Sequence, residues 1–370
     1  YRSLIASAGI LWGAVAIVAG CAGGLCAADA LPERPIVVTQ LPSGGQLESQ
    51  APPWSGLLPP RFGEGAQLAL IQPDGAMQIL AKGFHSACDP DVSFDGKRIL
   101  FAGKRAAGDP WNVYELTLSS GEIRQITKNI GDCRSPRYLG TFFTLDSPQP
   151  WYQCTFVGTS PGVLNEFGLA PLENLYSCKL DGSELRRLSF NLAGDVDPAI
   201  MLDGRLALAS WQHATAEQGS LGRMGIFGIN TDGTDFARLV ADQGSRIKHE
   251  PCPTTSGLLV FVEADETPWD GSGSLGCVTL RRPLHTYRAI TTKADGQFVS
   301  PSPLPDGRIL VSRRPSDDSQ PHAICRLDPA TGKFETLFAD PRHHYLQAKL
   351  VAPRPEPDGR SSNVREEDPH

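Results

Sequence analysis

The chain has 370 residues, of which 40% are hydrophobic and 20% charged, so it is long enough to bury a sizeable core. Glycine (38) and proline (31) are abundant, and with the moderate apolar content they predict many short strands rather than long helices. The formal net charge of -7 and the scattered basic residues argue against nucleic-acid binding through a basic face.

The first thirty residues predict an export segment. Arg2 precedes an apolar stretch that carries no further charge until Asp29. The motif "VAGC" at positions 18–21 resembles a bacterial lipoprotein processing box, so we favour Cys21 as a lipidation site. This predicts an exported protein of the periplasm or cell envelope that meets the membrane through a lipid anchor only. Cleavage at the A-x-A site over 28–30 and a retained membrane anchor are the alternatives.

Cysteine usage adds a prediction about redox chemistry. Export implies an oxidising compartment, and the chain has nine cysteines. An odd number remains after either cleavage, so at least one thiol is lipidated, free or partnered elsewhere. Cys154 and Cys178 fall in "WYQCTF" and "LYSCKL", which we expect to be neighbouring strands. A cross-strand disulfide and two buried thiols are both compatible with that placement.

One unit recurs from Asp89 onward. It consists of an x-Pro step, a short strand, a tight turn, a strongly apolar strand, a third strand, a Gly-containing turn and a fourth strand. Asp-Gly turns supply the positive φ that short hairpins need, and a proline that begins a strand removes no ladder hydrogen bond. Four-stranded units of about 40 to 50 residues are typical of propeller blades. The x-Pro steps are Asp89-Pro90, Ser135-Pro136, Asp197-Pro198, Glu250-Pro251 and Ser300-Pro301.

The repeat predicts an all-β fold, a six-bladed β-propeller with four-stranded blades. We expect the sixth blade to combine both ends of the chain, which closes the ring and removes open sheet edges. Its first strand is "HHYLQAKLVAP", "IVVTQ" over 36–40 is the candidate second strand, and "AQLALIQPDGAMQIL" supplies the other two. The predicted organisation is a targeting segment over 1–30, a linker over 31–65, the propeller over 66–353 with a long loop over 138–174, and a charged Pro-rich tail over 354–370 that is a linker or begins a further domain.

The repeat resembles that of TolB-type propellers, whose signature is x-Pro, a short strand, Asp-Gly-(Lys/Arg) and an apolar strand. "FHSACDPDVSFDGKRILFAGKR" and "HHYLQAKLVAPRPEP" resemble more particularly the N-terminal propeller region of proteins related to the hydrazine synthase alpha subunit. In that family the chemistry resides in c-type haems, attached through Cys-x-x-Cys-His beyond the propeller. This chain contains no Cys-x-x-Cys-His, so we carry over no catalytic residue and expect haem only in a missing downstream domain.

The favoured function is therefore a protein-binding or assembly module that docks a protein partner or an associated redox domain. One alternative is the N-terminal propeller part of a haem-containing redox subunit, and another is a TolB-like envelope-integrity protein. Two short motifs, G-x-S-x-G at 158–162 and G-x-G-x-x-G at 271–276, lack the strand-and-helix context of an enzyme site.

Polar residues gather in the segments that enter the first strand of each unit. In a propeller these entries surround the central channel at one mouth, so we interpret the residues as a polar funnel for a ligand, metal or partner. The alternative is that Asp and His side chains satisfy exposed backbone N–H groups. Ligand spacing is too irregular to specify a metal site. The funnel residues are His85, Asp89, Arg134, Asp195, Asp197, His249, Glu250, His343 and His344.

Overall fold

The computed structural model describes residues 31–44, 57–144, 147–212 and 221–362. The predicted targeting segment over 1–30 and the predicted lipidation site Cys21 lie outside these residues. Within them every regular element is a β-strand except one 3-10 turn, Lys293–Asp295, so the expected all-β class is confirmed. No helix of the described part has the length and apolar content that crossing a membrane requires.

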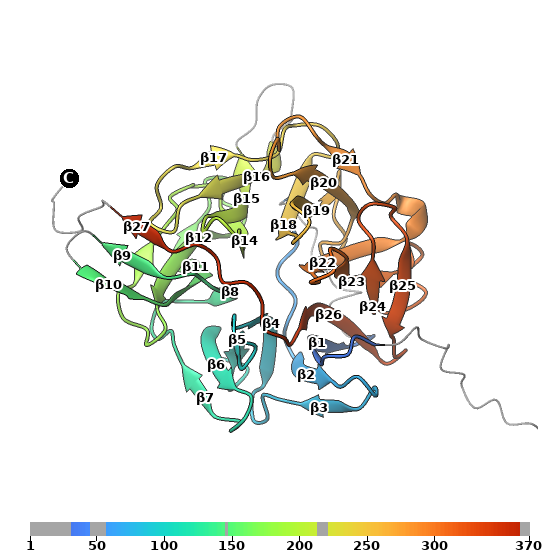
Figure 1. Cartoon of the computed structure of the whole chain (residues 1–370), viewed down its shortest axis with the longest axis horizontal. Helices are drawn as coiled ribbons and strands as arrows, with labels where there is room; N and C mark the ends of the chain where they lie inside the picture. Colours follow the sequence, from blue (N-terminus) through green and yellow to red (C-terminus); the bar gives the residue numbers. More distant parts are fainter. Residues whose placement is uncertain (1–30, 45–56, 145–146, 213–220, 363–370) are drawn as a thin grey trace, which may run out of the picture.

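Antiparallel sheets follow one another along the chain and stand around a central axis (Figure 1). The four-stranded unit expected from the repeat is confirmed. The first two sheets contain β4 (Ser86–Val92), β5 (Arg98–Lys104), β6 (Asn112–Thr117) and β7 (Ile123–Gln125), then β8 (Cys133–Tyr138), β11 (Gln153–Leu164), β12 (Pro171–Lys179) and β13 (Arg186–Arg187).

Two further units are joined into one larger sheet by a single parallel pair, Met224 with Ile247. They contain β14 (Asp195–Ile200), β15 (Leu206–Gln212), β16 (Arg223–Ile229) and β17 (Ala237–Arg238), then β18 (Ile247–Pro253), β19 (Leu258–Ala264), β20 (Ser274–Thr279) and β21 (Arg288–Ala289). The next sheet contains β22 (Gln297–Pro303), β23 (Ile309–Arg314), β24 (Ala323–Leu327) and β25 (Phe334–Phe338).

Strands from both ends of the chain share one sheet. It has the order β26 (His343–Leu350), β1 (Ile36–Pro42), β2 (Gln67–Ile71) and β3 (Met77–Ile79). The candidate strand over 36–40 is thus present as β1, and it pairs with β26 on one side and β2 on the other. Strand β26 also contacts β22 and β4, the innermost strands of the flanking sheets.

The second strand of each unit is apolar because neighbouring sheets cover both of its faces. In β5, Ile99 and Phe101 pack with Val37 and Leu68 of the preceding sheet. Leu100, which points the other way, packs with Phe156 of the following sheet. Alternate side chains of one strand therefore enter two different cores, which explains the continuous apolar run in the sequence.

The x-Pro steps lie in the middle of the innermost strands, so the prediction that proline begins each strand is wrong. Pairing in each of these strands shifts register at the step, which marks a β-bulge. A bulge takes the proline out of the ladder, so its missing N–H costs no hydrogen bond. The residue before each proline has a positive φ, for example 56° at Asp89 and 48° at Glu250. Gln347 has the same conformation (56°) without a following proline.

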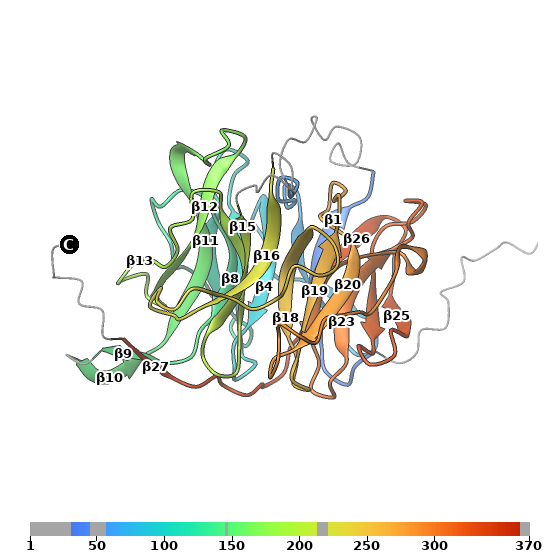
Figure 2. The ribbon, with the colours of Figure 1, turned by 90° about the horizontal axis from the view of Figure 1, so that it is seen from above.

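Two segments outside the repeat close the centre of the molecule. The inner segment, residues 57–62, lies in the central opening (Figure 1). The strap, residues 351–359, runs from β26 across one face toward β27 (Arg360–Ser362) (Figures 1 and 2). The Arg354 and Asp358 N–H groups donate to the carbonyls of Phe94 (2.9 Å) and Leu202 (3.0 Å), which belong to first-to-second strand turns.

The strap ends in a small sheet of its own. Strand β27 pairs in parallel with β9 (Phe142–Thr144), which also pairs with β10 (Ser147–Trp151). The expected long loop over 138–174 thus contains β9, β10 and the projecting β11–β12 hairpin (Figure 2). The described part of the predicted tail is held against one face by backbone hydrogen bonds, which its charged and Pro-rich composition did not indicate.

Candidate functional site

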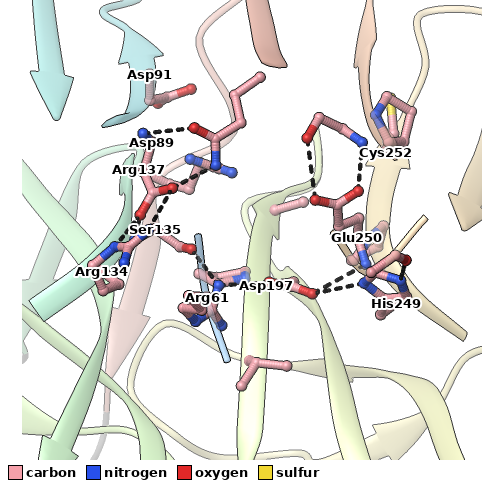
Figure 3. Close-up of a pocket in the computed structure, with 18 of the residues that line it drawn as sticks. Arg61, Asp89, Asp91, Arg134, Ser135, Arg137, Asp197, His249, Glu250 and Cys252 are labelled. Carbon is pink, nitrogen blue, oxygen red and sulfur yellow. Dashed lines mark hydrogen bonds and ion pairs between the residues drawn. The ribbon is translucent and has the colours of Figure 1, made fainter. Parts of the chain in front are cut away.

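A cavity of about 150 Å³ lies in the central channel. Its wall consists of the innermost strands β4, β8, β14, β18, β22 and β26, with the inner segment and Arg354 of the strap (Figure 3). Five of the nine funnel residues line it: Asp89, Arg134, Asp197, His249 and Glu250.

The residues at the bulges form one level of this cavity, which we call the bulge level. Four of them donate their backbone N–H to the side chain of the bulge residue on the preceding innermost strand, namely Asp89, Ser135, Glu250 and Ser300. Gln347 Oε1 accepts from the Asp89 N–H (2.8 Å), and an Asp89 carboxylate oxygen accepts from the Ser135 N–H (2.9 Å). The bulge level consists of Asp89, Ser135, Asp197, Glu250, Ser300 and Gln347.

The same pattern continues on the other side of the channel. Asp197 accepts from the Glu250 N–H (3.3 Å), and Glu250 accepts from both the N–H and the hydroxyl of Ser300. Carboxylates and an amide thus satisfy the neighbouring bulge, where positive φ costs about 1–3 kcal/mol per residue. This geometry supports the interpretation that Asp89, Asp197 and Glu250 satisfy backbone groups.

Arg61 of the inner segment bridges a gap in this series. The Ser135 side chain is shorter than the aspartate and glutamate side chains at other bulges. In the described structure no hydrogen bond joins it directly to Asp197. Instead Arg61 Nη1 donates to Ser135 Oγ (2.9 Å) and to Asp197 (3.1 Å) (Figure 3). Its Nε donates to Glu173 (3.2 Å). Burial would lower the pKa of Arg61, but Glu173 and Asp197 outweigh it and raise that pKa.

Asp89 forms a buried ion pair with Arg134. The Arg134 Nε lies 2.7 Å from Asp89 Oδ2, and its Nη2 donates to the Phe62 carbonyl (2.7 Å) of the inner segment. Burial would raise the pKa of Asp89, but Arg134 outweighs it and holds the pKa well below its usual range. The Arg134 guanidinium also stacks over the Trp111 ring at 4.2 Å. The pair is fully engaged with the protein's own groups.

His249 lies between two acceptors. Its Nδ1 is 3.3 Å from Asp197 Oδ2, and its Nε2 is 2.8 Å from the Gly271 carbonyl. Burial lowers the pKa of His249, but Asp197 and Glu250 raise it above its ordinary value. Burial raises the pKa of Glu250. The neighbouring residues His249 and Glu250 thus have a raised basicity and a lowered acidity, respectively. Both side chains are nevertheless held by hydrogen bonds to the protein's own groups.

The other four funnel residues lie elsewhere, so a single funnel of nine residues does not form. His85 is half-exposed beside Ser86 (2.8 Å), and His343 contacts Asp340 (3.2 Å). Asp195 is buried and accepts from Asn191 (3.2 Å). It fails to join Asp197 because the bulge at Asp197 breaks the side-chain alternation of β14.

His344 belongs to a separate buried cluster. Its Nδ1 lies 2.8 Å from Nδ1 of His322, whose Nε2 lies 2.9 Å from Asp270. Arg314 also contacts Asp270 (2.7 Å), and Trp269 packs edge-on against His344. Across the described ranges no group of three or more His, Cys, Asp or Glu side chains is arranged to hold a metal ion.

The described cysteines do not fit a c-type haem. All seven are buried free thiols, and no two have the spacing of a haem attachment motif. Cys154 and Cys178 lie directly opposite each other on β11 and β12, with their sulfurs 3.7 Å apart. Their placement on neighbouring strands is confirmed, and the disulfide between them stays a prediction.

Arg61 is one of the channel residues that the sequence analysis missed. It lies in the expected linker, outside the repeat, so no position within a repeat unit could place Arg61 in the channel. The available signal was local, because Arg61 is the single charged residue of the apolar stretch "LLPPRF".

Comparison with known proteins gives one sequence relative and several structural ones. No family model matches the chain. Hydrazine synthase subunit alpha of Kuenenia stuttgartiensis is 26% identical over 298 residues, which cover 67% of this chain and 37% of the relative. The solved Kuenenia stuttgartiensis hydrazine synthase superposes with a TM-score of 0.75 at 24% identity, over 90% of this chain and 48% of that one.

TolB from Acinetobacter baumannii superposes with a TM-score of 0.56 at 14% identity, over 85% of this chain and 66% of TolB. The chain spans less than half the length of the hydrazine synthase chains that it matches. It is a β-propeller module that resembles hydrazine synthase subunit alpha in sequence and fold, and it shares its fold with TolB.

Proposed function

We propose that the chain is a six-bladed β-propeller, closed through the β26–β1 pair, that acts as a protein-binding and assembly module of the cell envelope. Each innermost strand contacts the next, from β4 through β8, β14, β18, β22 and β26 back to β4, which supports a closed ring. The module corresponds to the propeller region of a subunit that resembles hydrazine synthase alpha. We further propose export and anchoring through a lipid on Cys21.

An exposed apolar surface carries the proposal. Six of the eleven exposed large apolar side chains in the described structure lie on the β11–β12 tip and the nearby loops. Concentrated apolar exposure marks protein–protein interaction sites, whereas single exposed side chains are ordinary. We call this surface the apolar patch; it consists of Val163, Leu164, Leu169, Phe190, Leu192 and Phe236.

Contacts between the loops support one continuous patch. The Glu166 N–H donates to the Leu192 carbonyl (2.8 Å), which ties the hairpin tip to the loop before β14. Phe190 and Phe236 line the same shallow hollow. Phe190 is 69% exposed and Leu192 60% exposed, so both would bury large apolar areas on binding. Burial of apolar surface contributes a favourable free energy of about 25 cal/mol per Å².

The test is the composition of the native assembly. Tagged full-length protein, with any downstream region, would be purified from its natural host and weighed by native mass spectrometry. We expect a stoichiometric assembly with other polypeptides, which Phe190→Ser with Leu192→Ser disrupts while the melting temperature stays unchanged. The matched control, Met77→Ser with Leu284→Ser, removes two side chains that are each 42% exposed elsewhere. Wild-type protein that purifies alone would contradict the proposal.

The second candidate is the propeller part of a haem-containing redox subunit, and the sequence similarity to hydrazine synthase subunit alpha favours it. The coding sequence downstream of residue 370 distinguishes this candidate from a haem-free module. A downstream Cys-x-x-Cys-His with a Soret absorbance in the purified full-length protein would establish it. A stop codon with no haem absorbance would leave the haem-free module.

A further inference from the structure

A second level of side chains lines the channel two residues beyond five of the six bulge residues, and Arg354 of the strap joins it. It is displaced toward the first-to-second strand turns, the side on which the strap lies (Figure 2). Three basic side chains, Arg137, Lys349 and Arg354, line the cavity here with one carboxylate, Asp91. We call this the basic level.

The single carboxylate of the basic level is already engaged. Asp91 Oδ2 accepts from the Tyr138 N–H (2.9 Å) and from Arg354 Nη2 (3.1 Å). Arg354 also donates to the Val92 carbonyl (2.8 Å). Asp91 and Arg354 therefore neutralise each other, and two positive charges remain.

Neither of those two charges forms an ion pair within the described structure, and the carboxylate that attracts Lys349, Asp91, is already engaged by Arg354. Arg137 donates to the Pro136 carbonyl (2.8 Å) and forms no ion pair there, and Lys349 forms neither an ion pair nor a side-chain hydrogen bond. Both are partly buried. Burial, together with the nearby Arg137, lowers the pKa of Lys349 to about 8, which leaves it mainly charged at pH 7. Cys252 faces both cations, but burial raises its pKa to about 12, so it stays neutral.

We propose that the basic level binds a small oxyanion, such as phosphate, sulfate or the carboxylate of a small metabolite, between Arg137 and Lys349. Partly buried cations without counter-charges are costly, and an oxyanion would supply charge-assisted hydrogen bonds to both. The cavity of about 150 Å³ suits a few heavy atoms. Because the strap crosses this mouth, we infer a diffusible small molecule rather than a polypeptide chain.

The test uses the full chain and measures thermal unfolding and calorimetric binding with inorganic phosphate. Potassium chloride at matched ionic strength serves as the reference, and acetate distinguishes a carboxylate-binding site from one selective for phosphate. We expect a saturable rise in melting temperature, because a ligand that binds only the folded state stabilises it. Lys349→Met and Arg137→Met should each weaken binding about tenfold or more, as expected for a lost charged hydrogen bond.

Controls separate this site from general charge effects and from misfolding. Lys82→Met and Arg281→Met remove exposed cations and should leave binding unchanged. Lys349→Arg keeps the charge and should retain most of the affinity for phosphate. It therefore tests whether binding needs the positive charge at position 349, even if Arg137→Met fails to fold. The proposal is overturned if neither phosphate nor acetate has a saturable effect beyond that of chloride. It is also overturned if Lys82→Met loses as much phosphate affinity as Lys349→Met. The apolar-patch variant should bind phosphate normally, which makes failure here distinct from failure of the assembly proposal.

Discussion

Asp91, Arg137 and Lys349 of the basic level each lie two residues beyond a residue of the bulge level on the same strand, yet the charges of the two levels are used differently. At the bulge level, Asp89 pairs with Arg134 and Asp197 pairs with Arg61. At the basic level, Arg137 and Lys349 have no ion pair in the described structure. Polarity in a channel therefore does not by itself identify a binding site. The informative feature is charge that the protein's own groups leave unneutralised.

The strongest test of the bulge level is Asp89→Asn. This change leaves the buried Arg134 without its counter-charge, so we expect unfolding free energy to fall by about 3–5 kcal/mol. Urea denaturation measures the change, with the exposed Glu122→Gln as control. A loss below that of the control would show that Asp89 is not structurally paired.

Acid titration tests the same ion pair in a second way. The folded-state pKa of Asp89 lies below its unfolded value, so its stabilisation is present above about pH 4 and is lost as the pH falls through the folded pKa. We expect Asp89→Asn to flatten the decline of stability below pH 4. Acid unfolding followed by tryptophan fluorescence measures this, and an unchanged slope would contradict the pairing with Arg134.

Arg61→Met should have the next largest effect. It leaves Glu173 and Asp197 without their shared cation and removes the link to Ser135. Because 22% of the Arg61 side chain remains exposed, we expect a loss of about 2–3 kcal/mol, below the range for fully buried pairs. Urea denaturation against Arg281→Met gives the comparison. A loss no larger than that control would remove Arg61 from the bulge level.

Lys349→Met should act in the opposite direction, with a gain of about 1–3 kcal/mol at pH 7. The folded pKa of Lys349 is lowered to about 8, so between about pH 8 and pH 10.5 the unfolded state binds more protons and wild-type stability rises with pH. The variant should lack that rise. Destabilisation by Lys349→Met at pH 7 would show that the lysine has a structural partner.

The smallest expected effect lies outside both levels. Under oxidising conditions we expect Cys154 and Cys178 to form the predicted disulfide, because they are directly opposed with their sulfurs 3.7 Å apart. Mass spectrometry of the unreduced protein would then detect the loss of two hydrogens. Free thiols at both positions after air oxidation would leave them as buried packing residues.

The sequence predicted the repeat well because each unit is specified locally. Asp-Gly turns, the apolar second strands and the x-Pro steps all occur within about 50 residues, and even the shared sheet of β26 with β1 followed from an incomplete unit at each end. The position of proline inside its strand was mispredicted, because a bulge and a strand start both tolerate a missing N–H.

The site was less predictable because it depends on contacts between distant parts of the chain. Asp89, Asp197 and Glu250 were identified by their phase in the repeat, but their partners come from neighbouring strands or from outside the repeat. Arg61 and Arg354 belong to such outside segments. Lys349 and Arg137 were passed over because the bulge, which brings them into the channel, changes the alternation that the sequence suggests.

The contrast between the two levels can be tested directly by crystallography of the full chain with selenate, an oxyanion that gives an anomalous signal. We predict an anomalous peak between Arg137 and Lys349, which disappears in Lys349→Met, and no peak beside Arg61 or Arg134. A peak at the bulge level, or none at the basic level with selenate present at saturating concentration, would contradict the division between structural and binding charges.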